Sequence, residues 1–331
     1  MKLLVVLALL QAPHALWQQG QRAEAIDAQT RAVAERPADV AARRLLVEWE
    51  IAVHHYERAL ELALPLPADA DPLRGRALYA LARYAEAAPL LADTNVDDAL
   101  RKIDALEALG KFAESDSALE RARTSAGAQD PRVRVCDGRR LLRLGRSQEA
   151  ARAFEAALDA DRWNREARYG LGRALIAAGE RERGLAVLAE HRKLVPLLDQ
   201  VDFAHQSLDL APMHAPNWAA LGDAERALGR ADRALEAYAR AVALATSCAD
   251  LVPACLRQAR MLDEDSADAD GAVRALAGAA ARCPDARLFV RAGDVLRGAG
   301  KKAEAAEQYA RAARLRPDDV EIARRLESVK Q

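Results

Sequence analysis

The sequence predicts an all-α chain in which short helical hairpins stack into a solenoid. Apolar residues make up 51% of the 331 residues but aromatic residues only 4%, which indicates closely packed helices with small side chains. Charged residues make up 30% and are interspersed with regular apolar positions, which argues against long disordered segments. One turn signature also recurs along the chain, as it does in repeat proteins.

The signature is a glycine that ends an apolar helical stretch, followed five residues later by a small residue. The clearest pairs are Gly145 with Ala150, Gly179 with Gly184, Gly229 with Ala234, and Gly300 with Ala305. Glycine suits a tight turn between antiparallel helices because it readily adopts positive φ. The small residue lets the second helix approach the first, and overfilling such a contact costs about 1–3 kcal/mol. Each hairpin buries one face and needs neighbours to cover the rest.

These positions resemble the tetratricopeptide repeat, a helix-turn-helix unit of about 34 residues. The copy that carries the resemblance best contains Trp218, Leu221, Gly222, Ala234, Tyr238 and Ala241. The resemblance implies about nine such units over residues 13–319, wound as a right-handed superhelix. Pro37, Pro284 and Pro317 are expected to end second helices, since proline lacks the amide donor.

Two stretches depart from this spacing. The small positions Ala25 and Ala59 are 34 residues apart, but the next two intervals are 28 each, so the second to fourth units are expected to be shortened. The gap from Gly179 to Gly229 is 50 residues, which predicts an inserted helix at about 197–210. That helix is either a packed spacer or an element that contacts a partner.

The two ends of the chain need separate interpretations. Residues 320–331 predict an amphipathic capping helix. Its expected apolar face is Val320, Ile322, Ala323 and Leu326, with Arg324, Arg325, Glu327 and Lys330 in water. Residues 1–12 contain Lys2 and an apolar run over 3–10, which favours a short signal peptide and a periplasmic or secreted protein. The alternative is a retained apolar helix in a cytoplasmic protein. The run is too short for a stable membrane span, which needs about 20 apolar residues.

The four cysteines lack the paired spacings of a structural zinc site. The repeat register places Cys255 and Cys283 at neighbouring helix ends, which makes a disulfide between them possible. Cys248, in the preceding connection, competes for the same bond. Unpaired buried thiols are the other interpretation.

The sequence predicts neither an enzyme nor a bound cofactor or metal. No histidine has a metal-ligand spacing, and His191 is expected at a core position. Nucleophile-elbow, P-loop and dinucleotide-binding patterns are missing from the sequence. The acidic run at 263–270 resembles a calcium loop only loosely and is expected to be a solvated loop. A net charge of −1 argues against a nucleic-acid partner.

In tetratricopeptide proteins the first helix of each unit lines a concave groove that binds peptides. The resemblance therefore implies a partner-binding set of Arg132, Arg139, Arg143, Tyr169, Arg173, Asp223, Arg226, Arg287, Asp294 and Arg297. Arginines beside Tyr169 can hold partner carboxylates through bidentate pairs, the alternative being a solvated helix face. Chaperone-binding members carry asparagine where this chain has Arg139 and Arg173, so that partner class is not expected.

We therefore expect a non-catalytic scaffold, bacterial and extracytoplasmic, that binds a protein or peptide segment in its groove. The alternative is a regulatory sensor whose inserted helix, at about 197–210, moves when a peptide or small ligand binds.

Overall fold

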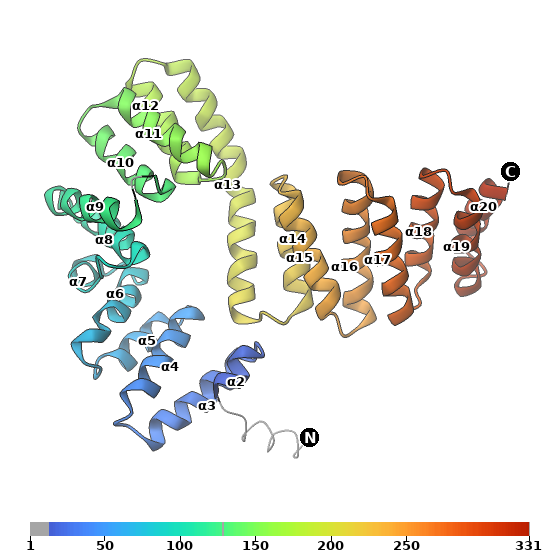
Figure 1. Ribbon diagram of the computed structural model, residues 1–331, viewed down its shortest axis with the longest axis horizontal. Helices are drawn as coiled ribbons and strands as arrows, with labels where there is room; N and C mark the ends of the chain where they lie inside the picture. Colours follow the sequence, from blue (N-terminus) through green and yellow to red (C-terminus); the bar gives the residue numbers. More distant parts are fainter. Residues whose placement is uncertain (1–12, 128, 331) are drawn as a thin grey trace. The chain divides into compact units, whose positions relative to one another are not determined.

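The computed structural model describes residues 13–127 and 129–330. The expected signal peptide or apolar helix, residues 1–12, lies outside the described residues. Throughout the described ranges every regular element is a helix, which confirms the all-α prediction. Figure 1 shows the helices following one another in short hairpins.

The chain divides into two compact units, Met1–Leu198 and Asp199–Gln331. The helices of the first unit are α2 (Pro13–Gln18), α3 (Arg22–Glu35), α4 (Val40–Ala52), α5 (Tyr56–Ala63), η1 (Ala68–Ala70), α6 (Asp71–Ala80), α7 (Tyr84–Ala87), α8 (Val96–Ala108), α9 (Phe112–Ala126), α10 (Pro131–Arg143), α11 (Ser147–Ala160) and α12 (Arg165–Ala177). Helix α13 (Arg181–Leu210) runs through the boundary. The second unit continues with α14 (Ala215–Ala227), α15 (Ala231–Leu244), α16 (Cys248–Arg260), η2 (Met261–Asp265), α17 (Ala269–Arg282), α18 (Ala286–Gly298), α19 (Lys302–Leu315) and α20 (Val320–Lys330).

The turns between paired helices confirm the role expected for glycine. Gly145, Gly229 and Gly300 adopt φ of 74°, 72° and 76°, in the left-handed region. Three hairpins have another residue at this point. There His54, Ala82 and Ala267 take the same conformation, with φ of 64°, 56° and 52°.

Small residues and glycines bring the paired helices together, as the sequence predicts. Ala59, Ala150 and Ala234 are completely buried at the small position. A Cβ atom added to Gly222 would lie 2.5 Å from the ring of Tyr238. Because no side chain fits there, the aromatic ring of the second helix packs directly on the backbone of the first.

Prolines limit several second helices. Helices α3, α17 and α19 end two residues before Pro37, Pro284 and Pro317, as expected. The shortening expected in the second to fourth units falls on α5 and α7, which have 8 and 4 residues, whereas α9 has 15. Pro65 follows α5 and Pro89 follows α7 within two residues of each helix end, and neither proline can donate the next helical hydrogen bond.

The expected inserted helix at 197–210 is not a separate element. It is the last part of α13, a single helix of 30 residues with Pro196 inside it. Leu198, Val201 and Leu208 are buried at helical spacing across this stretch, so the apolar stripe continues without a turn. The extra residues therefore lengthen a second helix instead of adding a new one.

The acidic run after α16 is not a plain loop either. Met261–Asp265 forms a short π-helix, η2, that continues α16. Asp268 then caps α17 by accepting a hydrogen bond from the amide of Gly271 at 2.8 Å. Ala267, just before this cap, has a φ of 52°.

Helix α20 packs on α19 through Ile322 and Val329, which are 4% and 6% exposed. The expected apolar face is partly wrong, since Val320 is 70% exposed and Ala323 is also exposed. Arg325 was expected in water, but it turns inward to form an ion pair with Asp294 of α18.

The disulfide expected between Cys255 and Cys283 is wrong. Cys248 is bonded to Cys283, with their Cα atoms 5.7 Å apart, whereas Cys255 is a buried free thiol. The error is one of register. Helix α16 begins at Cys248, with Pro253 inside it, so Cys255 lies two turns into the helix and only Cys248 reaches the end of α17.

Candidate functional site

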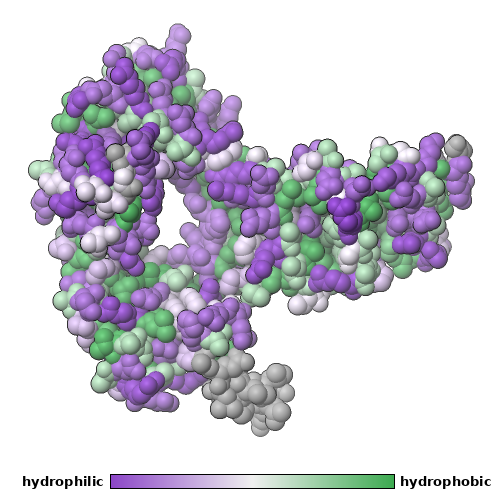
Figure 2. Space-filling view, viewed as in Figure 1, coloured by the Kyte–Doolittle hydropathy of each residue, from purple (hydrophilic) through white to green (hydrophobic). Residues whose placement is uncertain are grey.

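The predicted partner-binding residues lie on first helices of the hairpins, on α10 and α12 in the first unit and on α14 and α18 in the second. The surface that these helices form within each unit is called here the first-helix face of that unit. Hydrophilic and hydrophobic residues alternate over the visible surface of each unit (Figure 2).

In the first unit Arg139 is a hub between three carboxylates. Its guanidinium lies 2.5 Å from Asp104 and 2.9 Å from Glu107, both on α8, and it also pairs with Glu166 on α12. Burial raises the pKa of Glu107, while the nearby Arg139 charge acts in the opposite direction. The carboxylates that the sequence expected from a partner are therefore supplied by the chain itself.

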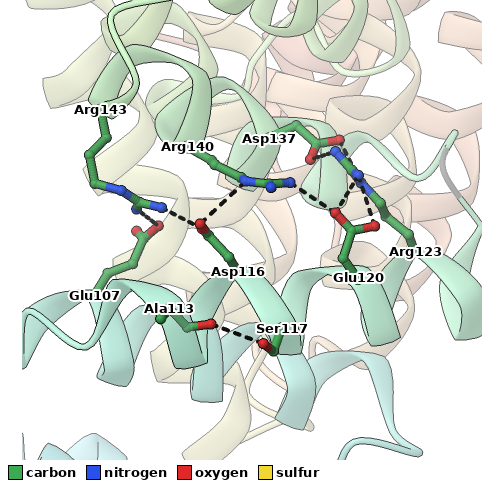
Figure 3. A network of polar contacts seen from close by, with 9 residues as sticks. All are labelled: Glu107, Ala113, Asp116, Ser117, Glu120, Arg123, Asp137, Arg140 and Arg143. Carbon is green, nitrogen blue, oxygen red and sulfur yellow. Dashed lines mark hydrogen bonds and ion pairs between the residues drawn. The ribbon is translucent and has the colours of Figure 1, made fainter.

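Arg143 belongs to a second network, drawn in Figure 3. It pairs with Asp116 and lies 3.6 Å from Glu107. Arg140 continues the network, 3.4 Å from Asp116 and 2.8 Å from Glu120. The contacts join α8, α9 and α10, so these arginines hold neighbouring hairpins together.

Arg132, at the start of α10, is also paired within the chain. It lies 2.6 Å from Asp97 of α8 and 2.8 Å from Asp130, the residue that caps its own helix. The bond to Arg132 holds the pKa of Asp130 below its usual range. All three predicted arginines of α10 thus already have carboxylate partners.

Tyr169 and Arg173 on α12 are exposed side chains, and Arg173 differs from the paired arginines of α10. Tyr169 is 47% exposed, and its ring lies 5.4 Å from the imidazole of His191. Arg173 is exposed, with its guanidinium 5.8 Å from the Tyr169 ring, and it has no ion pair with any residue that the structure describes. Burial and the charges of Arg165 and Arg168 lower the pKa of His191, so the imidazole is neutral at pH 7. His191 is half-buried against this pair, not at the core position expected for it.

In the second unit two hairpins carry the same polar arrangement. Tyr238 of α15 donates a hydrogen bond to Asp223 of α14 at 2.8 Å, and Tyr309 of α19 donates one to Asp294 of α18 at the same distance. Burial raises the pKa of Tyr309 to about 12, so its hydroxyl remains a donor. Each aspartate also pairs with an arginine of the next first helix, Asp223 with Arg257 at 3.1 Å.

Sequence reasoning missed these tyrosine–aspartate bonds, although a signal was present. Aspartate follows the packing glycine in the Gly222-Asp223 and Gly293-Asp294 pairs, and the second helices of both hairpins carry tyrosine. In the hairpin of α10 and α11 arginine follows the glycine, and the ring is that of Phe154, which has no hydroxyl.

The remaining predicted residues of the second unit are also paired. Arg226 lies 3.5 Å from Asp265 of η2, beside a hollow of about 550 Å³. Arg287 lies 2.8 Å from its own helix cap, Asp285, and Arg297 lies 3.9 Å from Asp294.

One hollow of this face combines apolar and charged groups, and it is called here the α18 pocket. It measures about 290 Å³ and lies between α16, α18 and α20. Leu256, Val290 and Ile322 supply apolar lining, and Arg316 is one of the charged residues that also line it. Arg316 is exposed and forms no ion pair with the described residues. The pocket can therefore take an apolar side chain next to an acidic group.

Over residues 13–127 and 129–330 no group of three or more histidine, cysteine, aspartate and glutamate residues has a geometry suited to a metal ion. Among the helices described, none is long and apolar enough to cross a bilayer.

Stacked hairpins with an exposed first-helix face define a helical repeat protein. Comparison with known families identifies the repeats. Two family models match, each described as tetratricopeptide repeat, one over residues 141–197 and one over residues 215–248. The chain therefore contains tetratricopeptide repeats, matched by family models over these two ranges.

Solved structures of low identity are similar to this chain. The APC/C hetero-tetramer Cut9-Hcn1 is 12% identical, covers 96% of this chain and 89% of that chain, and has a TM-score of 0.34. A MamA structure is 19% identical over 58% of this chain and 94% of that chain, with a TM-score of 0.32. The P58(IPK) TPR domain is 19% identical over 96% and 95%, with a TM-score of 0.29. No curated protein matches the chain.

Proposed function

We propose that this protein is a non-catalytic scaffold that binds a segment of a partner protein on the first-helix face of its second unit. Tetratricopeptide repeats in the chain support a role in protein–protein interaction. The proposal adds that the partner is a protein, not a nucleic acid, because the chain has no excess of positive charge, with 49 basic and 50 acidic residues.

The α18 pocket is the observation that carries the proposal. Most charges of the first-helix face are neutralised within the chain, so they offer little net attraction to a partner. Arg316 is a cation without an ion pair in the described part of the chain, and it lies beside an apolar floor. A partner segment with an apolar side chain next to an acidic residue would bury the first and pair the second.

The internal pairs also change the role assigned to the predicted arginines. Arg132, Arg139 and Arg143 are expected to stabilise the stack of hairpins. In the first unit Tyr169 and Arg173 remain as the exposed pair that a partner segment could contact.

The test is capture of proteins from the native source with wild-type protein and with Arg316→Glu. The matched control is Arg314→Glu, an exposed charge reversal on α19 that does not line the pocket. We expect the cognate partner to be depleted with the first variant alone. The captured partner is then purified and titrated, with affinity near the micromolar range, about −8 kcal/mol. Equal affinity for both variants would refute the pocket assignment.

We also propose that the protein is exported. Disulfides persist in oxidising compartments, so the Cys248–Cys283 bond supports this, as does the apolar run at 3–10. Intact mass of protein from the native source, without reductant, should show a shortened N-terminus and one disulfide. A full-length chain with all thiols reduced would contradict export.

A further inference from the structure

The two shortened second helices leave an apolar groove on the side of the first unit where α5 and α7 lie. The groove measures about 500 Å³ and is formed by α5, α6 and the segment after α7. It is called here the α5–α7 groove. Its apolar lining is Leu60, Leu64, Leu78, Leu81 and Leu90. It lies in the first unit, whereas the α18 pocket lies in the second, so the two sites share no residues.

The groove exists because two helices end early. Helix α7 stops after four residues, before Pro89, and α5 stops before Pro65. In a full-length hairpin another one to two turns of helix would cover the leucines between them. Leu64, just past the end of α5, is 68% exposed as a result.

The basic and acidic residues at the rim of the groove differ in whether they form ion pairs. Arg83 pairs with Glu86 at 2.6 Å, and Arg74 pairs with Asp71 and donates to backbone carbonyls at the end of α5. Both rim cations are therefore neutralised. Glu57 and Glu61, which also line the groove, are exposed and form no ion pair or hydrogen bond with the residues that the structure describes.

Glu57 and Glu61 lie four residues apart on α5, so their carboxylates project from one face about 6 Å apart along the helix axis. Two cations separated by one turn of a partner helix would match that spacing. The leucines between the rims would accept the apolar side chains of the same helix.

We propose that the α5–α7 groove is a second docking site, and that it binds a basic amphipathic helix of a partner protein. The helix places apolar side chains on the leucines and lysines or arginines against Glu57 and Glu61. An acidic segment of the kind expected at the α18 pocket would be repelled here, so the two sites take partners of opposite charge. This inference does not depend on the proposed function of the α18 pocket.

The probe is a labelled synthetic helix with leucines on one face and lysines one turn apart beside them. A second probe carries glutamates in place of the lysines. Fluorescence anisotropy with the full chain at low salt should show binding of the basic probe only, since exposed charge pairs are screened at high salt. Glu57→Gln with Glu61→Gln should weaken binding about tenfold.

Reversal of the rim is the sharper experiment. Glu57→Lys with Glu61→Lys should bind the acidic probe better than the basic one. The matched control is Glu304→Gln with Glu307→Gln, which removes two exposed charges from α19 in the second unit and should leave binding unchanged. The same assay compares binding of the basic probe by Leu64→Gln with its binding by the control Leu315→Gln, since both leucines are exposed at the end of a second helix. Only Leu64→Gln should weaken binding.

Equal binding of both probes, no change with the rim variants, or an equal loss with the α19 control would overturn the proposal. All of the substituted glutamates are exposed, so the variants are expected to fold, and circular dichroism checks this. Arg316→Glu should leave binding of the basic probe unchanged, which keeps the outcome separate from that of the α18 pocket.

Discussion

Replacing Arg139 with alanine distinguishes a structural arginine from a partner-binding one. In the folded chain its guanidinium faces Asp104, Glu107 and Glu166, and its side chain is only 25% exposed. The substitution would remove the cation that all three carboxylates share, and among the described residues only Glu107 would keep another nearby, Arg143 at 3.6 Å. Removing one member of a buried pair costs about 3–5 kcal/mol, and partial exposure reduces this to about 2–3 kcal/mol here.

The control is Arg173→Ala, at the same position of the next hairpin, where the guanidinium is exposed beside Tyr169. We expect this change to alter the free energy of unfolding by less than about 0.5 kcal/mol. Urea unfolding at neutral pH, followed by circular dichroism, measures both variants under one set of conditions.

Acidification provides a second readout. Burial already raises the folded-state pKa of Glu107, and loss of the Arg139 charge would raise it further. A carboxyl group with a raised folded-state pKa favours folding below its unfolded pKa, about 4.3, and loses that contribution as pH rises through the folded value. The cost of Arg139→Ala should therefore shrink below about pH 5. A loss of unfolding free energy below about 1 kcal/mol at neutral pH, or a loss that does not change with pH, would refute the structural role of Arg139.

Three further changes test the fold. Ala82→Gly should stabilise the chain by about 1 kcal/mol, because Ala82 has a φ of 56° and glycine adopts that conformation without strain; an unchanged urea midpoint would contradict this. Gly222→Ala should destabilise it by about 1–3 kcal/mol, because the new methyl group meets the Tyr238 ring at 2.5 Å, and a melting temperature equal to wild type would count against the packing. Asp285→Asn keeps the helix cap but removes a charge that Arg287 stabilises, and the pKa of Asp285 is lowered for that reason. A carboxyl group with a lowered folded-state pKa stabilises the folded chain above its unfolded pKa, about 3.9, and this contribution is lost as the pH falls through the folded-state pKa. The free energy of unfolding of the variant should therefore be lower than that of wild type at pH 7 and equal to it in strong acid.

The hairpin architecture could be predicted from local pattern. A glycine with positive φ and a fully buried small residue leave distinct marks in the sequence, as Gly229 and Ala234 do. The shortened units were also visible as intervals of 28 residues. Helix boundaries were harder. The repeat spacing predicted a separate inserted helix and placed Cys255 at a helix end, whereas α13 continues through Pro196 and α16 begins at Cys248.

The positions of the candidate site residues could be predicted from the sequence, but their ion pairs could not. The repeat register placed Arg139 and Asp223 on first helices correctly. It did not show that their charges are already paired, because the partners lie on other hairpins. Asp104 is 35 residues from Arg139, and Glu166 is 27 residues from it. The α5–α7 groove was missed as well. The repeat spacing showed that the units are short, but it did not show which leucines the shortened helices leave uncovered.

What the amino-acid sequence determined by itself is the repeating hairpin, because a turn and a close helix contact depend on residues a few positions apart. Which charges pair, which cysteine reaches Cys283 and which hollows stay open were decided only by the tertiary structure. Those outcomes depend on side chains from different hairpins coming within a few ångströms, and that distance is set by how the hairpins stack.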